Sequence, residues 1–373
     1  MKFRVERDDL ANAVTWAARA LPNRPSIPTL SGLLLNAEDA ALSISGFDME
    51  NASKAAVDAS VDEAGSALVS GRLLADISKS LPAKPVVVSV EGNRVEVECG
   101  RSSFALPTLP VNEYPKLPEM PDPVGSLPGA NFAHAVSQAA VAAGRDDTLP
   151  MLLGVRIEID DNKVTMAATD RYRLAVRELT WTSLNPGFTG NALVPARVLA
   201  DAAKQLVQAD EVRIAYAPET AGEGLMGFEG EGRATTTRLL DGEFPKYRQL
   251  LPDETDTLAT VSTSELIEAV KRVSLVAERN TPVKLNFTDG EVSLRAGSGD
   301  EAQASESVEC KIDGEPIEIA FNPGYLLDGL GAIDTEDVNV AFTNSTRPAV
   351  LTPTSNTPAD SYQYLLMPVR LSS

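Results

Sequence analysis

Three segments of this 373-residue chain resemble one another at intervals of about 125 positions. They read VSGRLLADI (69–77), VPARVLADA (194–202) and FNPGYLLDG (321–329). The first two share Val, Arg, Leu, Ala and Asp in register, whereas the third retains only the Leu and the Asp. Because repeated sequence folds into repeated structural units, the pattern predicts three similar domains.

An amphipathic helix is predicted near the start of each repeat. Apolar residues recur every three or four positions in Leu10–Leu21, Phe132–Ala143 and Leu266–Ala277, the spacing that places them on one helical face. Asp8-Asp9 and Thr263–Glu265 are of the residue types that cap helix N-termini, and we expect them to do so here.

The segments between the helices alternate apolar and polar residues and are broken by turn sequences, a pattern typical of short antiparallel strands. Proline-rich connectors at 107–128 and 245–252 indicate where one repeat gives way to the next. The predicted fold class is α+β, with three tandem similar domains that each place two helices on one face of antiparallel sheet. The predicted domains are 1–118, 128–248 and 255–373.

Composition and missing motifs exclude several classes of protein. No apolar run approaches the ~18 residues of a membrane helix, and the N-terminus lacks a signal-type apolar stretch. Two cysteines, Cys99 and Cys310, and one histidine, His134, form no disulfide framework, metal motif or catalytic triad. The glycine-rich segment 221–234 lacks the Lys-Ser/Thr of a phosphate loop and favours a mobile hairpin. We expect a cytoplasmic protein without metal, cofactor or catalytic site.

Charge gives a mixed indication about nucleic acid. The chain has 33 Lys and Arg against 53 Asp and Glu, a net charge of −20, which repels DNA at long range. Basic residues nevertheless gather on the predicted helices or just after them, namely Arg24, Arg72, Lys79, Arg145, Arg197, Lys204, Lys271, Arg272 and Arg279. Such a helix face would attract a phosphate backbone without reading bases. The alternative is that these are ordinary solvated helix residues.

Six segments in order resemble the bacterial DNA sliding clamps, the beta subunits of the replicative DNA polymerase III. They are RPSIPTLSGLLL (24–35), VSGRLLADI (69–77), ATDRYRLAV (168–176), LLDGEFPKYRQLLP (239–252), IAFNPGYLLD (319–328) and YLLMPVRL (364–371). The resemblance spans the whole chain.

The resemblance implies the clamp fold and a head-to-tail homodimeric ring that encircles double-stranded DNA without sequence specificity. Helices would line the channel and sheets would form an acidic outer wall. An ATP-driven clamp loader would place the ring on DNA, where it would tether the replicative DNA polymerase for processive synthesis. Repair proteins and other proteins with a clamp-binding motif would dock in the same peptide pocket. Such a subunit is not an enzyme.

The resemblance also assigns residues. DNA contacts match Arg24, Arg72, Arg145 and Arg197, although Asp146 and Asp147 beside Arg145 would weaken phosphate attraction there. The dimer interface matches Phe104 and Leu106 against Leu275 and Val276. The partner-peptide pocket matches Leu152, Thr169, Arg173, Leu174, Pro245, Leu250, Leu365, Met367, Pro368, Val369 and Arg370. Many relatives have Gly-His at the positions of Arg171-Tyr172 and Arg at that of Gln249, so partner preference is expected to differ.

Two other functions remain open at this point. One is an acidic three-domain scaffold for proteins that never meets DNA, and the other is an enzyme that uses segment 221–234 as a lid. Two residue assignments also have simpler alternatives. Leu275 and Val276 would be core residues of their own helix, and the MPVRL segment would be a final edge strand.

Overall fold

The computed structural model describes all residues except 219–223, 253, 278–280, 298–301, 358 and 371–373. The chain divides into two compact units, each described here by itself. Unit 1 contains Met1–Ala130 and Gln205–Leu239, and unit 2 contains Asn131–Lys204 and Leu240–Ser373. Among the described residues no helix is long and apolar enough to cross a membrane.

Unit 1 holds the first repeat and some strands of the second. Its elements are β1 (Lys2–Val5), α1 (Arg7–Ala17), β2 (Gly32–Glu38), β3 (Ala41–Phe47), β4 (Asn51–Asp58), β5 (Ser60–Glu63), β6 (Gly65–Ser70), α2 (Gly71–Ser80), β7 (Val86–Glu91), β8 (Arg94–Cys99), β9 (Ser102–Leu109), β10 (Pro123–Leu127), β16 (Val212–Ala217), β17 (Leu225–Gly230) and β18 (Arg233–Arg238). Within this unit the strand order is β10-β16-β17-β18-β4-β3-β2-β6-β9-β8-β7-β1-β5.

Unit 2 holds the rest of the second repeat and the third. Its elements are α3 (Gly129–Ala140), β11 (Gly154–Asp160), β12 (Lys163–Thr169), β13 (Arg173–Thr180), β14 (Thr182–Ser183), β15 (Thr189–Pro195), α4 (Ala196–Gln205), β19 (Thr257–Ser262), α5 (Thr263–Val273), β20 (Val283–Thr288), β21 (Gly290–Ala296), β22 (Ala304–Asp313), β23 (Ile317–Phe321), α6 (Pro323–Gly331), β24 (Asp337–Phe342), β25 (Ala349–Pro353) and β26 (Ser361–Leu366). Its strands run in the order β15-β11-β12-β13-β26-β25-β24-β19-β22-β21-β20-β23.

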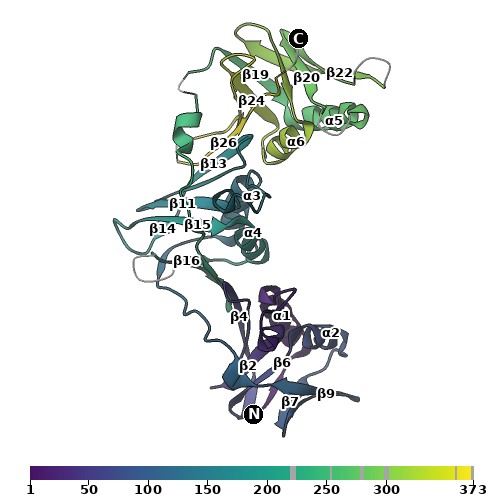
Figure 1. Ribbon diagram of the computed structural model, residues 1–373, viewed down its shortest axis with the longest axis vertical. Coiled ribbons are helices and arrows are strands. Elements are labelled where there is room, and N and C mark those ends of the chain that lie inside the picture. The colour runs from purple at the N-terminus through teal and green to yellow at the C-terminus, as the bar shows by residue number, and fades with distance from the viewer. Residues whose placement is uncertain (219–223, 253, 278–280, 298–301, 358, 371–373) are drawn as a thin grey trace. The chain divides into compact units, whose positions relative to one another are not determined.

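The helices form where the apolar spacing predicts them, and each buries one face, but α1, α3 and α5 end at Ala17, Ala140 and Val273, three or four residues earlier than predicted. Helix α1 packs against β3 and β4 and α2 against β2 and β6, while α5 packs against β21 and β22 and α6 against β26. The two helices of the first repeat also contact each other, as do α5 and α6 (Figure 1). Strands such as β8 alternate buried and exposed residues, as antiparallel sheet with one solvated face requires.

The predicted helix caps are wrong. Helix α1 already begins at Arg7, so Asp8 and Asp9 lie in its first turn, and the N-cap Glu6 makes no side-chain hydrogen bond. Thr263 is likewise the first residue of α5 rather than its cap. The acids in the first turn of α1 still interact favourably with the positive end of the helix dipole.

Two antiparallel strand pairs join one repeat to the next. In unit 1, β18 of the second repeat pairs with β4 of the first, with Arg233 opposite Ala55 and Thr237 opposite Asn51. In unit 2, β26 of the third repeat pairs with β13 of the second. Continuous backbone hydrogen bonding therefore crosses both boundaries and covers strand edges that would otherwise be exposed.

Candidate docking site on unit 2

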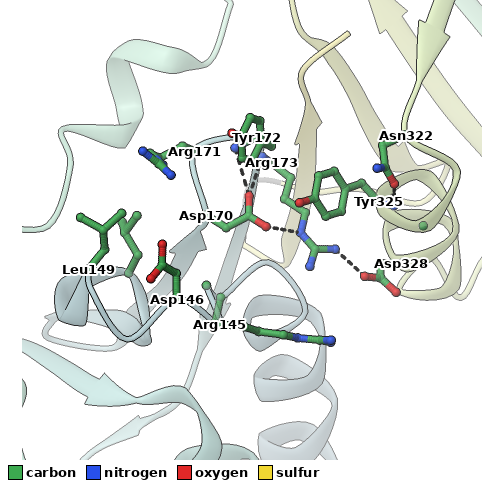
Figure 2. Close-up of a pocket in the computed structure, with 14 residues that line it drawn as sticks. Arg145, Asp146, Leu149, Asp170, Arg171, Tyr172, Arg173, Asn322, Tyr325 and Asp328 are labelled. Carbon is green, nitrogen blue, oxygen red and sulfur yellow. Dashed lines mark hydrogen bonds and ion pairs between the residues drawn. The ribbon is translucent and has the colours of Figure 1, made fainter. Parts of the chain in front are cut away.

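Arg173, the first residue of β13, organises a polar cluster at the boundary between the second and third repeats. Its side chain is only 4% exposed. Its Nε lies 3.0 Å from Asp170 Oδ2, and its Nη1 lies 2.5 Å from Asp328 Oδ2 and 3.3 Å from the Tyr364 hydroxyl. The guanidinium also stacks over the Tyr325 ring, 4.5 Å from its centroid. Figure 2 shows the two ion pairs, which link the turn before β13 to helix α6.

This environment keeps the Arg173 cation charged. Burial by itself would lower the pKa of the guanidinium, but the contacts with Tyr364, Asp328 and Asp170 raise that pKa above its ordinary value. A buried charge with this many hydrogen-bond partners is stabilised, whereas the same charge without them would be costly.

The turn between β12 and β13 is fixed by its own side chains. Asp170 Oδ1 accepts hydrogen bonds from the N–H groups of Tyr172 and Arg173, at 3.0 and 3.1 Å. Thr169 Oγ1 accepts the Arg171 N–H and donates to the Arg173 carbonyl. Arg171 has φ of 81°, a left-handed conformation that is strained for a residue with a side chain. The turn thereby presents Tyr172 to solvent.

A cavity of about 640 Å³ opens beside this turn. Its lining comes from the segment after α3, the β12–β13 turn and the start of α6, and consists of Ala143, Gly144, Arg145, Asp146, Leu149, Leu152, Asp170, Arg171, Tyr172, Arg173, Asn322, Gly324, Tyr325 and Asp328. Asn322 caps α6 by accepting the Tyr325 N–H. Tyr325 stacks with Tyr172, their ring centroids 6.1 Å apart (Figure 2).

An apolar cluster lies next to the polar one. Leu174 and Leu365 face each other across the β13–β26 pair, and both are buried with Val176, Phe244 and Tyr247. Met151, Leu240 and Leu251 pack against this cluster. Segments that adjoin it in the chain or through the C-terminal segment carry exposed apolar side chains, namely Tyr172, Leu250, Met367 and Val369. Buried apolar clusters with exposed apolar residues on adjoining segments are typical of surfaces that take the anchor side chains of a partner.

Glu158 holds one edge of this surface in place. Its Oε2 accepts hydrogen bonds from the Tyr247 hydroxyl at 3.1 Å and from Arg248 Nη2 at 2.6 Å. Both donors belong to the short 3₁₀ turn Tyr247–Leu250, which carries the half-exposed Leu250. Burial raises the pKa of the Glu158 carboxyl, but the hydrogen bonds from Arg248 and Tyr247 outweigh it, and the pKa lies below its ordinary value.

The predicted pocket residues divide between two neighbouring places. Leu152 and Arg173 line the cavity, whereas Leu174 and Leu365 belong to the buried cluster. Thr169 is buried at the end of β12, and Pro245 is exposed between Phe244 and the 3₁₀ turn. Strand β26 ends at Leu366, so Met367–Arg370 form no edge strand, and that alternative for the MPVRL segment is wrong.

Sequence reasoning missed Asn322, Tyr325 and Asp328. All three lie within FNPGYLLDG, which belongs both to the third repeat and to a segment that carries the clamp resemblance, but neither pattern assigns them to a site. Pro323 predicts the start of a helix here, and α6 does begin at Pro323, but a helix start does not indicate that Asn322 and Tyr325 line a cavity. Nothing in the sequence indicates that Asp328 meets Arg173, because 155 positions separate the two residues.

Comparison with known proteins assigns the chain to a family. Three models match it in order: DNA polymerase III beta subunit N-terminal domain over residues 1–118, central domain over 126–246 and C-terminal domain over 248–370. The beta sliding clamp of Streptomyces coelicolor is 57% identical over 375 residues, and that of Vibrio cholerae is 30% identical, each alignment covering 100% of both chains. The chain belongs to the DNA polymerase III beta subunit family.

Solved structures of the family share the fold. The DNA polymerase sliding clamp from Bacillus subtilis superposes with a TM-score of 0.93 at 26% identity. The sliding clamp from Pseudomonas aeruginosa, solved bound to griselimycin, gives a TM-score of 0.92 at 29% identity. Both matches cover 100% of each chain. The prediction of three similar α+β domains is confirmed, and as a member of this family the chain is a non-catalytic processivity factor of DNA polymerase III.

The residues that the clamp resemblance assigns to DNA are exposed in both units. In unit 1, Arg72 lies in the first turn of α2 and donates a hydrogen bond of 3.0 Å to the Asn23 side chain, beside Arg24 in the chain. In unit 2, Arg197 lies in the first turn of α4, and Arg145 follows α3 and lines the cavity. Within the described part of the chain none of these four forms an ion pair with an acid. Arg279 lies outside the described residues.

The residues assigned to the dimer interface differ strongly in exposure. Leu275 is 84% exposed, which rules out a core role for it. Phe104 and Val276 are partly buried. Leu106 is already buried within unit 1 and contributes little surface of its own.

Segment 221–234, predicted to be a mobile hairpin, is described only in part. Its first three residues lie within 219–223, outside the described residues. The rest of the segment contains β17 and the start of β18.

Proposed function

We propose that two copies of this chain close head to tail into a ring around duplex DNA. We further propose that the docking site on unit 2 tethers the replicative DNA polymerase to that ring and also receives the clamp loader and repair proteins. The observation that carries the proposal is a pair of strand edges that match the two joints within the chain. The predicted domain limits, 1–118, 128–248 and 255–373, and a location in the cytoplasm are part of the same proposal.

The two joints within the chain follow one rule. In each, the second strand of a repeat's last hairpin pairs with the second strand of an earlier hairpin in the preceding repeat. Thus β18 of hairpin β17–β18 pairs with β4 of hairpin β3–β4. In the same way β26 of hairpin β25–β26 pairs with β13 of hairpin β12–β13.

Among the described strands, one strand at each end of the series of repeats lacks the partner that this rule predicts. Strand β22, of hairpin β21–β22, is the third-repeat counterpart of β4 and β13, and over Ala304–Glu309 it pairs only with β21 among the described strands. Strand β9, of hairpin β8–β9, is the counterpart of β18 and β26, and over Ser102–Pro107 it pairs only with β8 among the described strands. Pairing β22 of one copy with β9 of another repeats the joint, and doing so twice closes a twofold ring.

The exposed apolar residues fit this joint. Leu275 follows α5, the helix that packs against β22, and Phe104 lies on β9. Arg272 of α5 is ion-paired with Glu306 of β22 at 2.5 Å, so the helix and the strand edge are held together. Burial of Leu275 against a second copy would remove an exposed leucine from water, worth roughly 1.5–3 kcal/mol.

Contact with DNA is proposed through the exposed basic side chains on the helices. Arg72 and Arg197 occupy matching positions at the starts of α2 and α4. Arginines without acidic partners can contact phosphates, and phosphate contacts carry no sequence information. Loose contacts of this kind allow a ring to slide along the duplex.

A topological experiment tests the ring. The protein is loaded onto nicked circular DNA with clamp loader and ATP, freed of unbound protein by gel filtration, and the DNA is then cut once. Encirclement predicts that the protein stays on the intact circle and leaves the linear product. Equal retention on both forms would indicate ordinary surface binding and contradict the ring.

A further inference from the structure

A second groove lies on the solvent-facing side of β20–β23 in unit 2. It has a volume of about 890 Å³, and its basic side chains are Lys284 of β20, Arg295 of β21 and Arg370 after β26. All three are exposed, and Glu318 is the single acid among the residues that line the groove. None of the three bases forms an ion pair with an acid in the described part of the chain.

The arrangement of Lys284 and Arg295 is unfavourable in the isolated chain. The two residues lie directly opposite each other in the antiparallel β20–β21 pair, where like charges repel and destabilise the sheet. The chain has 53 acidic residues against 33 basic ones, so acidic partners for Lys284 and Arg295 would be easy to supply. Because neither residue forms an ion pair among the described residues, both remain available to an anionic ligand.

The C-terminal segment connects this groove with the docking site. Met367 N–H donates to the Tyr172 carbonyl at 2.9 Å, and Val369 N–H donates to the Ala320 carbonyl at 2.8 Å. Val369 and Arg370 line the groove, while Met367 lies beside the β12–β13 turn of the docking site. A peptide held at the docking site therefore needs only a short extension along Met367–Arg370 to reach the cationic groove.

We propose that this groove binds acidic residues that flank the docking segment of partner proteins, an inference that rests on the proposed docking function. Lys284, Arg295 and Arg370 supply the charge, and the side chains of Asn286, Ser293 and Ser305 supply further hydrogen-bonding groups. A polynucleotide fits less well, because Glu318 lines the groove and Glu291 and Glu309 face each other on the same strands. Those acids repel a continuous phosphate backbone, whereas a peptide can place separated carboxylates against Lys284, Arg295 and Arg370.

Paired peptides test the proposal. Each carries Leu and Phe anchors, with a flanking run of glutamates in one and of glutamines in the other, and the run is placed on either side of the anchors in turn. Binding of labelled peptides to the full-length protein is followed by fluorescence anisotropy at low and high salt. The protein variants are Lys284→Gln with Arg295→Gln and, as a control with the same change in charge, Lys311→Gln with Arg347→Gln. The control residues are exposed in the third repeat and do not line the groove.

We expect the glutamate peptide to bind wild-type protein about three- to tenfold more tightly than the glutamine peptide at low salt, an advantage that high salt removes. Lys284→Gln with Arg295→Gln should abolish the advantage and leave glutamine-peptide binding unchanged, and the control variant should keep both. Equal binding of the two peptides to wild-type protein overturns this inference but not the docking site. Failure of both to bind overturns the docking site and the inference with it. Single-stranded oligothymidylate that binds through Lys284 and Arg295 and excludes the glutamate peptide would reassign the groove to nucleic acid.

Discussion

The guanidinium of Arg173 and the carboxylate of Asp328 meet at 2.5 Å, although 155 positions separate them in the chain. Arg173 begins β13 in the central domain, and Asp328 lies in α6 of the C-terminal domain. The pair therefore supports the same domain boundary that the β13–β26 strand pair forms. It also holds one wall of the cavity, since both residues line it.

Arg173→Ala should lower the free energy of unfolding by roughly 3 kcal/mol, because it leaves the largely buried Asp170 without its cation, whereas Asp328, at 43% exposed, can be solvated. Chemical denaturation followed by fluorescence measures the change. Arg171→Ala serves as the control, since Arg171 lines the same cavity but is exposed, and should change stability by less than about 0.5 kcal/mol. Similar effects of the two substitutions would show that the Arg173 network does not stabilise the boundary.

Glu158→Gln should weaken the attachment of the 3₁₀ turn Tyr247–Leu250 and lower stability by roughly 1–2 kcal/mol at neutral pH, because a neutral amide accepts weaker hydrogen bonds than a carboxylate. The pKa of Glu158 in the folded protein lies below its ordinary value of 4.5, so the folded state binds fewer protons than the unfolded state. The stabilisation is therefore complete above that ordinary value and is lost as the pH falls through the lowered pKa.

Urea denaturation of wild type and Glu158→Gln over a pH series checks this. The difference in free energy of unfolding between wild type and Glu158→Gln should be largest near neutral pH and shrink in acid below about pH 4. Glu243→Gln alters an exposed carboxylate near the turn and should show no such convergence. A difference that stays constant with pH would mean that Glu158 acts through packing rather than charge.

Local order along the chain was predictable because it depends on periodicity. Leu266 and Val270 lie on the buried face of α5 as their spacing predicts. The pairing of β26 with β13 was not predictable in the same way, since the alternating pattern of a strand does not say which other edge it will meet. The clamp resemblance assigns Arg173 to the partner pocket, but neither it nor the sequence pattern points to Asp328 and Tyr325, which reach Arg173 only through the packing of α6 beside the β12–β13 turn.

Arg24→Glu combined with Arg72→Glu and Arg197→Glu should shorten retention on circular DNA by at least about tenfold, because three phosphate-attracting charges become repulsive. The lifetime of labelled protein on closed circles, measured at several salt concentrations, tests this, and sedimentation shows whether self-association is intact. The matched control is Arg94→Glu with Arg213→Glu and Arg347→Glu, three exposed arginines located off the helices. If both variants lose retention time on circular DNA equally, the effect comes from net charge alone, which would contradict a DNA-facing role for the helices.

Deletion of residues 367–373 should weaken binding of Leu- and Phe-bearing peptides by more than about 30-fold while self-association persists. The deletion removes Met367 and Val369, two of the exposed apolar residues of the docking site, and such residues dominate binding energy when they are central to an interface. Deletion of 371–373 alone is the control and should retain most of the affinity. Peptide binding that survives the longer deletion would place the docking site elsewhere.

Leu275→Asp should shift the protein from dimer toward monomer and raise the dissociation constant by about 30-fold or more, because it removes an apolar contact and buries an unpaired carboxylate. Analytical ultracentrifugation over a concentration series measures the shift. Leu184→Asp is the matched control, since Leu184 is also an exposed leucine but lies in neither β9, β22 nor the helix beside β22, and it should leave the dimer intact. If Leu275→Asp dimerises as tightly as wild type, the joint between copies does not use the surface beside β22, and the pairing of β22 with β9 proposed above must be given up.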